Sequence, residues 1–228
     1  MKIRLVLILV IIFALMNSCK EVQKKNRIKE GYIEYNIEYL DASMDNFMVG
    51  LLPKKMTVKF KNNNTINKIE GFSGIVSFTH IQNYKQKENI TLVKILNKKY
   101  KYVEKLNKES LFFEKLPGMK IELTDSVKQL CGFNSHQALI TTPSSNIKSF
   151  DIFYTNDIII NNVNALTPFN SIDGVLLEFQ IKFYNMNMRL TANKIESAQV
   201  SLNEFEIPKG YEPINRSTMI EIIDLLQN

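Results

Sequence analysis

The chain has 228 residues and a formal net charge of +6. Seven of its 29 basic residues and two of its 23 acidic residues precede residue 31, which leaves 22 basic and 21 acidic residues for the remainder. That near-neutral balance argues against a nucleic-acid partner, because such a surface needs clustered Lys and Arg side chains to displace counterions from phosphate.

The first residues have the layout of a secretory signal peptide. Lys2 and Arg4 precede an unbroken apolar run from Leu5 to Met16. These twelve residues are too few for a membrane-spanning helix, which needs about 20 apolar residues. The charged, apolar and small-residue segments in this order predict a signal peptide over residues 1–18.

The residues around Cys19 indicate a lipid anchor. Leu15-Met16-Asn17-Ser18-Cys19 resembles a bacterial lipobox, in which the cysteine becomes the first residue and receives acyl chains. The alternative is an ordinary signal peptide with an incidental cysteine. Residues 19–30 are polar and basic, and we expect a flexible tether beside the membrane. The protein is therefore expected in the cell envelope, anchored to the outer membrane and facing the periplasm or the cell surface.

Residues 31–228 are expected to form a single domain rich in strands. Gly31–Leu40 alternates between apolar and polar residues, which predicts a long strand with one face on a core. Neither a helical nor a strand period fits Thr65–Phe72. Further strands are predicted at Thr57–Lys61, Gly74–Gln82, Ile90–Leu96 and Lys99–Leu106, with turns at Asn62-Asn63-Asn64 and Asn97-Lys98.

One early segment has the period of a helix. Apolar residues recur at i, i+3, i+4 and i+7, the spacing of one helical face. They are Met44, Phe47, Met48 and Leu51. Pro53 follows and would end this helix.

The second half of the chain continues the strand pattern. Val175–Phe183 has the clearest alternation, and Met186–Ala192 is its expected hairpin partner. Thr155–Gly174 is rich in asparagine and is predicted to be a long loop over a sheet edge. Other strands are predicted at Met119–Thr124, Ala138–Thr142, Phe150–Thr155, Lys194–Val200 and Glu204–Ile207, with a helical turn at Asp125–Leu130.

A last helix is predicted near the C-terminus. Met219, Ile222, Ile223 and Leu226 share one face. Thr218, with Glu221 three residues later, fits a capping box at the start of this helix. In total we expect a mainly β, α+β fold with a large antiparallel sheet of roughly ten or eleven strands and two helices. Such a sheet must roll up or be covered, because otherwise its apolar face stays exposed to water.

Catalytic and metal-binding motifs are absent from the sequence. Gly71-Phe72-Ser73-Gly74 lacks the spacing of a nucleophile elbow, and no H-E-x-x-H, C-x-x-C or phosphate-binding glycine loop occurs. His80 and His136 have no suitable ligand cluster beside them, so we expect ordinary structural roles for both. Cys131 has no cysteine partner if Cys19 is acylated, and we expect it to be a small buried hydrophobic side chain. The sequence predicts no enzyme, no catalytic residue, no metal and no cofactor.

Methionine is frequent on the predicted inward faces, at Met44, Met48, Met186 and Met188. Methionine is flexible and polarizable, and it is common at hydrophobic binding surfaces. Two interpretations remain open at this point. The residues either pack a core or line an apolar concavity between a curled sheet and its helix.

Four stretches of the sequence resemble bacterial lipoproteins of uncharacterised function in the LolA–LolB-like superfamily. They are Gly31-Tyr32-Ile33-Glu34-Tyr35, Leu130-Cys131-Gly132-Phe133 leading to Ala138-Leu139-Ile140, Asp173-Gly174-Val175-Leu176-Leu177-Glu178, and Phe205-Glu206-Ile207-Pro208-Lys209-Gly210-Tyr211. The resemblance covers residues 31–228 and implies a curved antiparallel half-barrel wrapped around one or two helices. In carriers of that superfamily the concave face receives the acyl chains of lipoproteins, and no catalytic residue is shared.

The resemblance leads to one expected function and one alternative. The expectation is a membrane-anchored, non-enzymatic protein that binds an acyl chain or a lipidated protein in the half-barrel. The residues that would line this cavity are Phe47, Met48, Leu51, Phe179, Ile181 and Met188. The alternative is a structural or protein-interaction module of an envelope complex, in which the protein's own side chains fill the same interior.

Overall fold

The computed structural model describes residues 27–41, 52–71, 74–108, 111, 116–143, 149–183 and 186–225. The strands are β1 (Glu30–Tyr39), β2 (Lys55–Lys61), β3 (Asn64–Gly71), β4 (Val76–Asn83), β5 (Glu88–Ile95), β6 (Lys98–Lys105), β7 (Lys120–Leu130), β8 (Phe133–Thr141), β9 (Ser149–Thr155), β10 (Val175–Phe183), β11 (Met186–Ser197) and β12 (Glu212–Pro213). A 3₁₀ helix, η2 (Leu202–Phe205), and an α-helix, α3 (Arg216–Leu225), follow β11. Within these ranges, no helix has the length and apolarity needed to cross a membrane.

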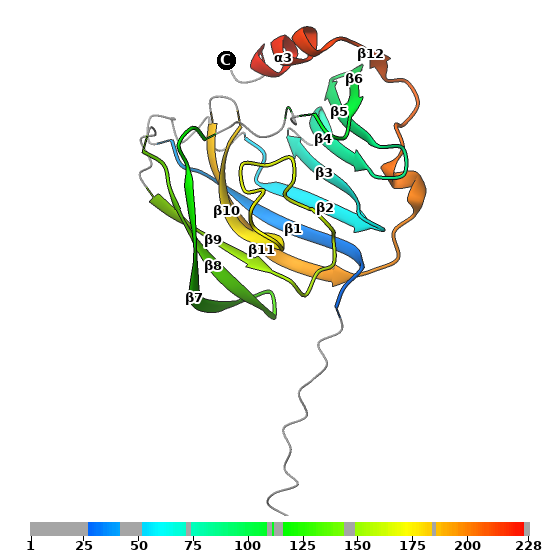
Figure 1. Ribbon diagram of the computed structural model, residues 1–228. Coiled ribbons are helices and arrows are strands. Elements are labelled where there is room, and N and C mark those ends of the chain that lie inside the picture. The colour runs from blue at the N-terminus through cyan, green and yellow to red at the C-terminus, as the bar shows by residue number, and fades with distance from the viewer. Residues whose placement is uncertain are drawn as a thin grey trace, which may run out of the picture.

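The strands form one open sheet of twelve strands in the order β12-β6-β5-β4-β3-β2-β1-β11-β10-β9-β8-β7 (Figure 1). Neighbouring strands pair antiparallel, except that β12 runs parallel to β6. The predicted mainly β fold is confirmed. The sheet has twelve strands where ten or eleven were expected, and the parallel β12 makes it mixed at one edge.

Aromatic contacts across the sheet show that it is strongly curved. Phe78 on β4 and Phe183 on β10 make an edge-to-face contact with ring centroids 5.3 Å apart, although four strands lie between them in the sheet. In a flat sheet these strands would be about 24 Å apart, at about 4.8 Å per strand. We call the face that carries these two rings the inner face, and the opposite face the outer face.

The segment 156–174 fills the inner side of the sheet (Figure 1). It is a loop, as predicted, but its apolar side chains enter the core instead of lying over an edge. Phe169 and Ile172 are both buried, and Phe169 meets Phe150 of β9 edge to face. Asn164 is also buried, and its Nδ2 donates to the carbonyl oxygens of Ile172 and Gly174, each at 2.8 Å. These bonds close the loop on itself, so asparagine supplies the polar contacts that a buried loop backbone needs.

Two stretches that were not predicted as strands belong to the sheet. The helical turn predicted at Asp125–Leu130 is wrong, because these residues continue β7. The register against β8 shifts between Leu123 and Val127, and this bulge interrupts the two-residue alternation of the strand. The unassigned stretch Thr65–Phe72 contains β3, whose Ile66 and Ile69 pack on opposite faces of the sheet.

The chain after β11 also differs from the prediction. Lys194–Val200 is not a separate strand, because β11 continues without a break to Ser197. The strand predicted at Glu204–Ile207 is wrong, since η2 occupies Leu202–Phe205. The Ser201 side chain accepts a hydrogen bond from the backbone N–H of Asn203, which is the N-cap contact that starts a helical turn.

One of the two predicted hairpin turns is confirmed, and the other is shifted by one residue. Asn62 and Asn63 have φ of 50° and 64°, so the asparagine turn between β2 and β3 is confirmed. Between β5 and β6 the paired residues are Ile95 and Lys98, and the turn residues are therefore Leu96 and Asn97 rather than Asn97 and Lys98. Leu96 adopts φ of 54°, which a leucine rarely does.

The C-terminal helix α3 is confirmed, with a different cap. Met219 and Ile223 are buried against the core. Asn215 caps the helix, because its Oδ1 accepts from the Thr218 N–H at 2.9 Å. The predicted capping box at Thr218 is therefore wrong by three residues. Leu226 and the helix predicted around Met44–Leu51 lie outside the described residues.

Gly31, at the start of β1, is required by a close backbone approach. It has φ of 155°, and a Cβ added there would lie 2.1 Å from the backbone oxygen of Glu196 on β11. We expect Gly31→Ala to lower the free energy of unfolding by about 1–3 kcal/mol, because the two strands must separate. Gly210→Ala is the control, since Gly210 also has a positive φ but no atom within 4 Å. Urea denaturation of both variants measures the difference, and equal losses would contradict this account.

Candidate functional site

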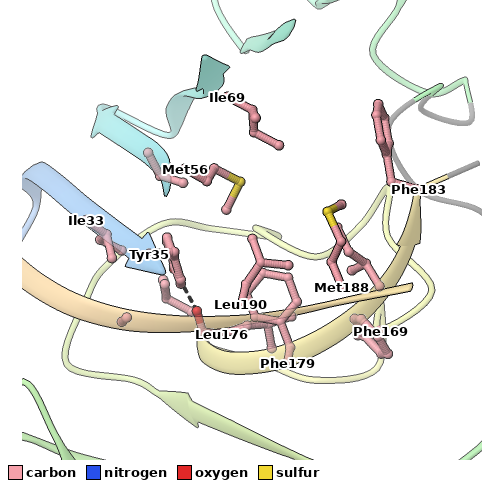
Figure 2. Close-up of a cluster of buried hydrophobic side chains, with 14 of the residues drawn as sticks. Ile33, Tyr35, Met56, Ile69, Phe169, Leu176, Phe179, Phe183, Met188 and Leu190 are labelled. Carbon is pink, nitrogen blue, oxygen red and sulfur yellow. Dashed lines mark hydrogen bonds between the residues drawn. The ribbon is translucent and has the colours of Figure 1, made fainter. Parts of the chain in front are cut away.

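The predicted ligand-lining residues divide into two groups. Phe47, Met48 and Leu51 lie outside the described residues. Phe179, Ile181 and Met188 lie together on the inner face, with 6%, 5% and 1% of their surface exposed. Figure 2 shows Phe179 and Met188 there.

The inner face is packed by the chain's own side chains. The Phe179 ring meets the Tyr35 ring edge to face with centroids 5.8 Å apart, and the Tyr35 hydroxyl donates to the Leu176 oxygen at 2.7 Å (Figure 2). Burial raises the pKa of Tyr35, so this hydroxyl stays a neutral donor.

A cavity of about 70 Å³ remains between the inner face and the segment 156–174, beside Tyr35 and Val163. A cavity that holds benzene measures about 150 Å³, so this space is too small for an acyl chain.

A buried polar group lies on the inner face of β4 and β5. His80 Nε2 is 2.7 Å from Asn89 Oδ1, and both residues are buried. Burial lowers the pKa of His80 to about 4, although the Asn89 hydrogen bond acts in the opposite direction. The imidazole is therefore neutral at pH 7. His136 is exposed on β8, far along the sheet order from β4, and the part of the chain described holds no group of three metal-binding side chains.

Cys131 does not have the environment of a reactive thiol. It is half-buried in the tight turn between β7 and β8, with φ of 49°. Its Sγ donates to the Ala192 oxygen at 3.2 Å, and burial raises its pKa. The thiolate form that a nucleophile needs is therefore disfavoured.

A much larger hollow lies on the outer face, under a segment that the sequence did not single out as a site. Residues 198–211, which we call the C-terminal strap, cross the outer face of β2–β6 between β11 and β12 (Figure 1). Between the strap and the sheet is an outer groove of about 790 Å³.

Both ends of the strap are fixed to the sheet. Near its start, Val200 is buried and its carbonyl accepts from Lys61 Nζ at 2.9 Å. In its middle, Phe205 is buried against Ile81 and Ile90, and its carbonyl accepts from Asn83 Nδ2 at 3.3 Å. Lys59 also pairs with Glu204. Directly after the strap, β12 pairs with β6. The strap that spans the groove is therefore fixed to the sheet at each end, and it is not a free loop.

The floor of the outer groove changes from charged to apolar along the strands. Cross-strand partners define three rows: Glu70, Ser77, Lys94 and Lys99; then Lys68, Thr79, Leu92 and Lys101; then Ile66, Ile81, Ile90 and Val103. Lys101, Ile90 and Val103 extend these rows beyond the residues that line the groove. The three rows span about 13 Å at about 3.3 Å per residue. The groove thus combines a polar end with an apolar end.

One sequence signal could have indicated the outer groove. β4 carries no charged residue on either face, and seven of its eight residues are buried. An antiparallel strand with one face in water alternates between apolar and polar residues, and Ser77 and Thr79 supply polar residues on the outer face of β4. The absence of charge was therefore compatible with a cover on the outer face, and only the structure shows that the strap provides it.

Comparison with solved structures gives a distant likeness of fold. No protein-family model and no curated protein matches the sequence. A solved structure entitled "Structure of PNGF-II in C2 space group" is similar over 85% of this chain, with a TM-score of 0.51 and 13% sequence identity. This chain spans about a third of that protein's length, since 32% of it is covered. The likeness concerns the fold alone.

Proposed function

We propose that this protein is a lipid-anchored, non-enzymatic binding protein of the cell envelope that holds its ligand in the outer groove. The size of the groove carries this proposal. At about 790 Å³ it falls within the range of about 300–1,000 Å³ that is usual for small-molecule sites, whereas the inner cavity measures about 70 Å³. The curved sheet would be the half-barrel of the LolA–LolB-like superfamily, with its interior used for stability rather than for cargo.

The test fills each hollow separately with a tryptophan. Thr79 lies on the floor of the outer groove, and Val163 lines the inner cavity. Native mass spectrometry of the full chain, extracted from membranes, should show a co-purifying ligand that Thr79→Trp removes and Val163→Trp retains. Thr141→Trp, at an exposed position of β8, is the control for adding a tryptophan to the sheet.

The opposite pattern would overturn the proposal. Loss of the ligand with Val163→Trp alone would return the site to the interior, where the acyl-chain hypothesis places it. Retention of the ligand in both variants would exclude the outer groove as the site. Circular dichroism of each variant establishes that the sheet is intact.

The proposed anchor makes a prediction of its own. Acyl chains on Cys19 would bind the membrane with about 0.8 kcal/mol per buried methylene. We therefore expect Cys19→Ala to move the protein almost completely from the detergent phase to the aqueous phase in Triton X-114 partitioning. Cys131→Ala is the matched control and should stay in the detergent phase. Detergent partitioning of Cys19→Ala would contradict the lipid anchor.

A protein-interaction module is the second candidate. β7 is the last strand of the sheet, and its Leu123 and Val127 are 59% and 52% exposed. Exposed apolar residues on an edge strand are typical of sites where another chain adds a strand. If no small ligand co-purifies, a stoichiometric membrane partner that is lost on Leu123→Lys would favour this candidate.

A further inference from the structure

The outer groove contains a cross-strand pair of lysines, for which the described residues supply no ion-pair partner. Lys94 on β5 lies directly opposite Lys99 on β6, and both line the groove. Like charges at directly opposed positions destabilise a sheet. Lys94 Nζ donates to the Gly74 oxygen at 2.8 Å, and Lys99 Nζ lies 5.9 Å from the centre of the Tyr211 ring. Neither ammonium group forms an ion pair with a carboxylate of the described residues.

The charges that line the groove leave an excess of cations. Five lysines and three glutamates line it. Two lysines are paired within the lining, Lys59 with Glu204 and Lys68 with Glu70 at 2.7 Å. Among the described lining residues, three lysines remain without a partner in the lining and only one acid remains. The lysines are Lys94, Lys99 and Lys209, and the acid is Glu206. This excess favours a ligand with an anionic group.

The apolar side of the groove favours a ligand with a hydrocarbon part. Ile66, Ile81 and Leu92 line it from the sheet, and Ile207 and Pro208 line it from the strap. Ser77, which is buried, lies directly opposite Lys94 and adds a hydroxyl beside the lysine pair. Along β5, Lys94 marks the cationic end of the groove floor and Ile90 marks its apolar end.

We propose that the outer groove binds an anionic amphiphile, with its carboxylate or phosphate on Lys94, Lys99 and Lys209 and its apolar part over Leu92 and Ile81. This inference rests on the proposed function and names its ligand class. A fatty-acid carboxylate and a single-chain lipid phosphate share this chemistry, and the probes distinguish them.

The experiment titrates soluble short-chain probes into the full chain, held in phosphatidylcholine nanodiscs, with empty nanodiscs as the blank. The probes are octanoate, octyl phosphate and the uncharged octanol, and calorimetry measures their binding. We expect at least one anionic probe to bind at least tenfold more tightly than octanol, with affinity that falls as the NaCl concentration rises. The tighter of the two anions identifies the head group.

Lysine variants locate the anion. Lys99→Gln should lower the affinity for the anionic probe at least tenfold and leave the affinity for octanol unchanged. Lys99→Arg should restore most of the affinity for the anionic probe. Lys98→Gln is the matched control, because Lys98 is the exposed neighbour on β6 that does not line the groove. Lys94→Gln should repeat the Lys99→Gln result, so that one poorly folded variant does not decide the question.

Two results would overturn this inference and still leave the proposed function intact. They are equal binding of octanol and the anions, or unchanged affinity in both Lys94→Gln and Lys99→Gln. A different result removes the proposed function as well, namely unchanged probe binding in Thr79→Trp, because the ligand would then lie outside the groove.

Discussion

Replacing Phe169 with alanine is expected to lower the free energy of unfolding by about 3–5 kcal/mol, the usual cost of deleting a buried phenyl ring. Phe169 belongs to a loop, where a substitution of this kind is normally tolerated. Here the ring is fully buried and meets Phe150 edge to face, with centroids 6.4 Å apart. The side chain thus holds the segment 156–174 inside the curved sheet.

Urea denaturation of Phe169→Ala and of the unchanged chain measures this loss. Leu123→Ala is the control, because Leu123 is an exposed apolar residue on the edge strand β7 and should change stability by less than about 0.5 kcal/mol. A cost below about 1 kcal/mol for Phe169→Ala would mean that the loop is a removable cover. The interior would then be open to a hydrophobic guest, as the acyl-chain hypothesis requires.

Acidification from pH 6.5 to pH 4 is expected to remove roughly 3 kcal/mol of stability through His80 alone. Burial lowers the pKa of His80 from 6.5 to about 4 in the folded protein. Between these two values the unfolded chain binds a proton that the folded chain does not. The contribution of His80 is therefore complete above pH 6.5, and it is lost as the pH falls through 4.

The variant His80→Gln isolates this effect. Its side-chain amide can still donate a hydrogen bond to Asn89 Oδ1, but it does not titrate. The difference in unfolding free energy between His80→Gln and the unchanged chain should therefore vary with pH between 6.5 and 4. His136→Gln, at an exposed position of β8, is the control for replacing a histidine with glutamine. Parallel curves for His80→Gln and the unchanged chain would show that His80 is not buried in solution.

Part of the fold could be predicted because its local pattern reports its surroundings directly. β1 alternates cleanly because one of its faces lies on the core and the other carries Glu34 and Glu38. The asparagine turn at Asn62 and Asn63 was predictable for a related reason, since asparagine tolerates the positive φ that this turn needs.

Other elements were missed where a distant segment changes the environment of a strand. Ile66 of β3 packs under the strap, more than a hundred residues later in the chain, so the alternation of β3 is lost. The bulge between Leu123 and Val127 interrupts the alternation of β7 in the same way. A short stretch of sequence contains no information about the strap that covers β3 or about the bulge in β7.

The candidate site follows the same division. The sequence indicated the inner face through Phe179, Ile181 and Met188, since apolar alternation marks the side of a strand that is buried. It could not indicate whether a ligand or the protein itself fills that side. The segment 156–174 decides this for the described residues, because loop conformation depends on tertiary contacts such as that between Phe169 and Phe150.

The amino-acid sequence by itself determined the mainly β class and the buried side of most strands, because these depend on composition and on the two-residue period of a strand. The export signal at residues 1–18 stays a prediction from the sequence. Only the tertiary structure decided that, among the described residues, the segment 156–174 packs into the interior and that a groove lies under the C-terminal strap. The physical reason is strand pairing. Lys94 and Lys99 become neighbours through the β5–β6 register, and the strap reaches Ile81 only after the sheet has formed.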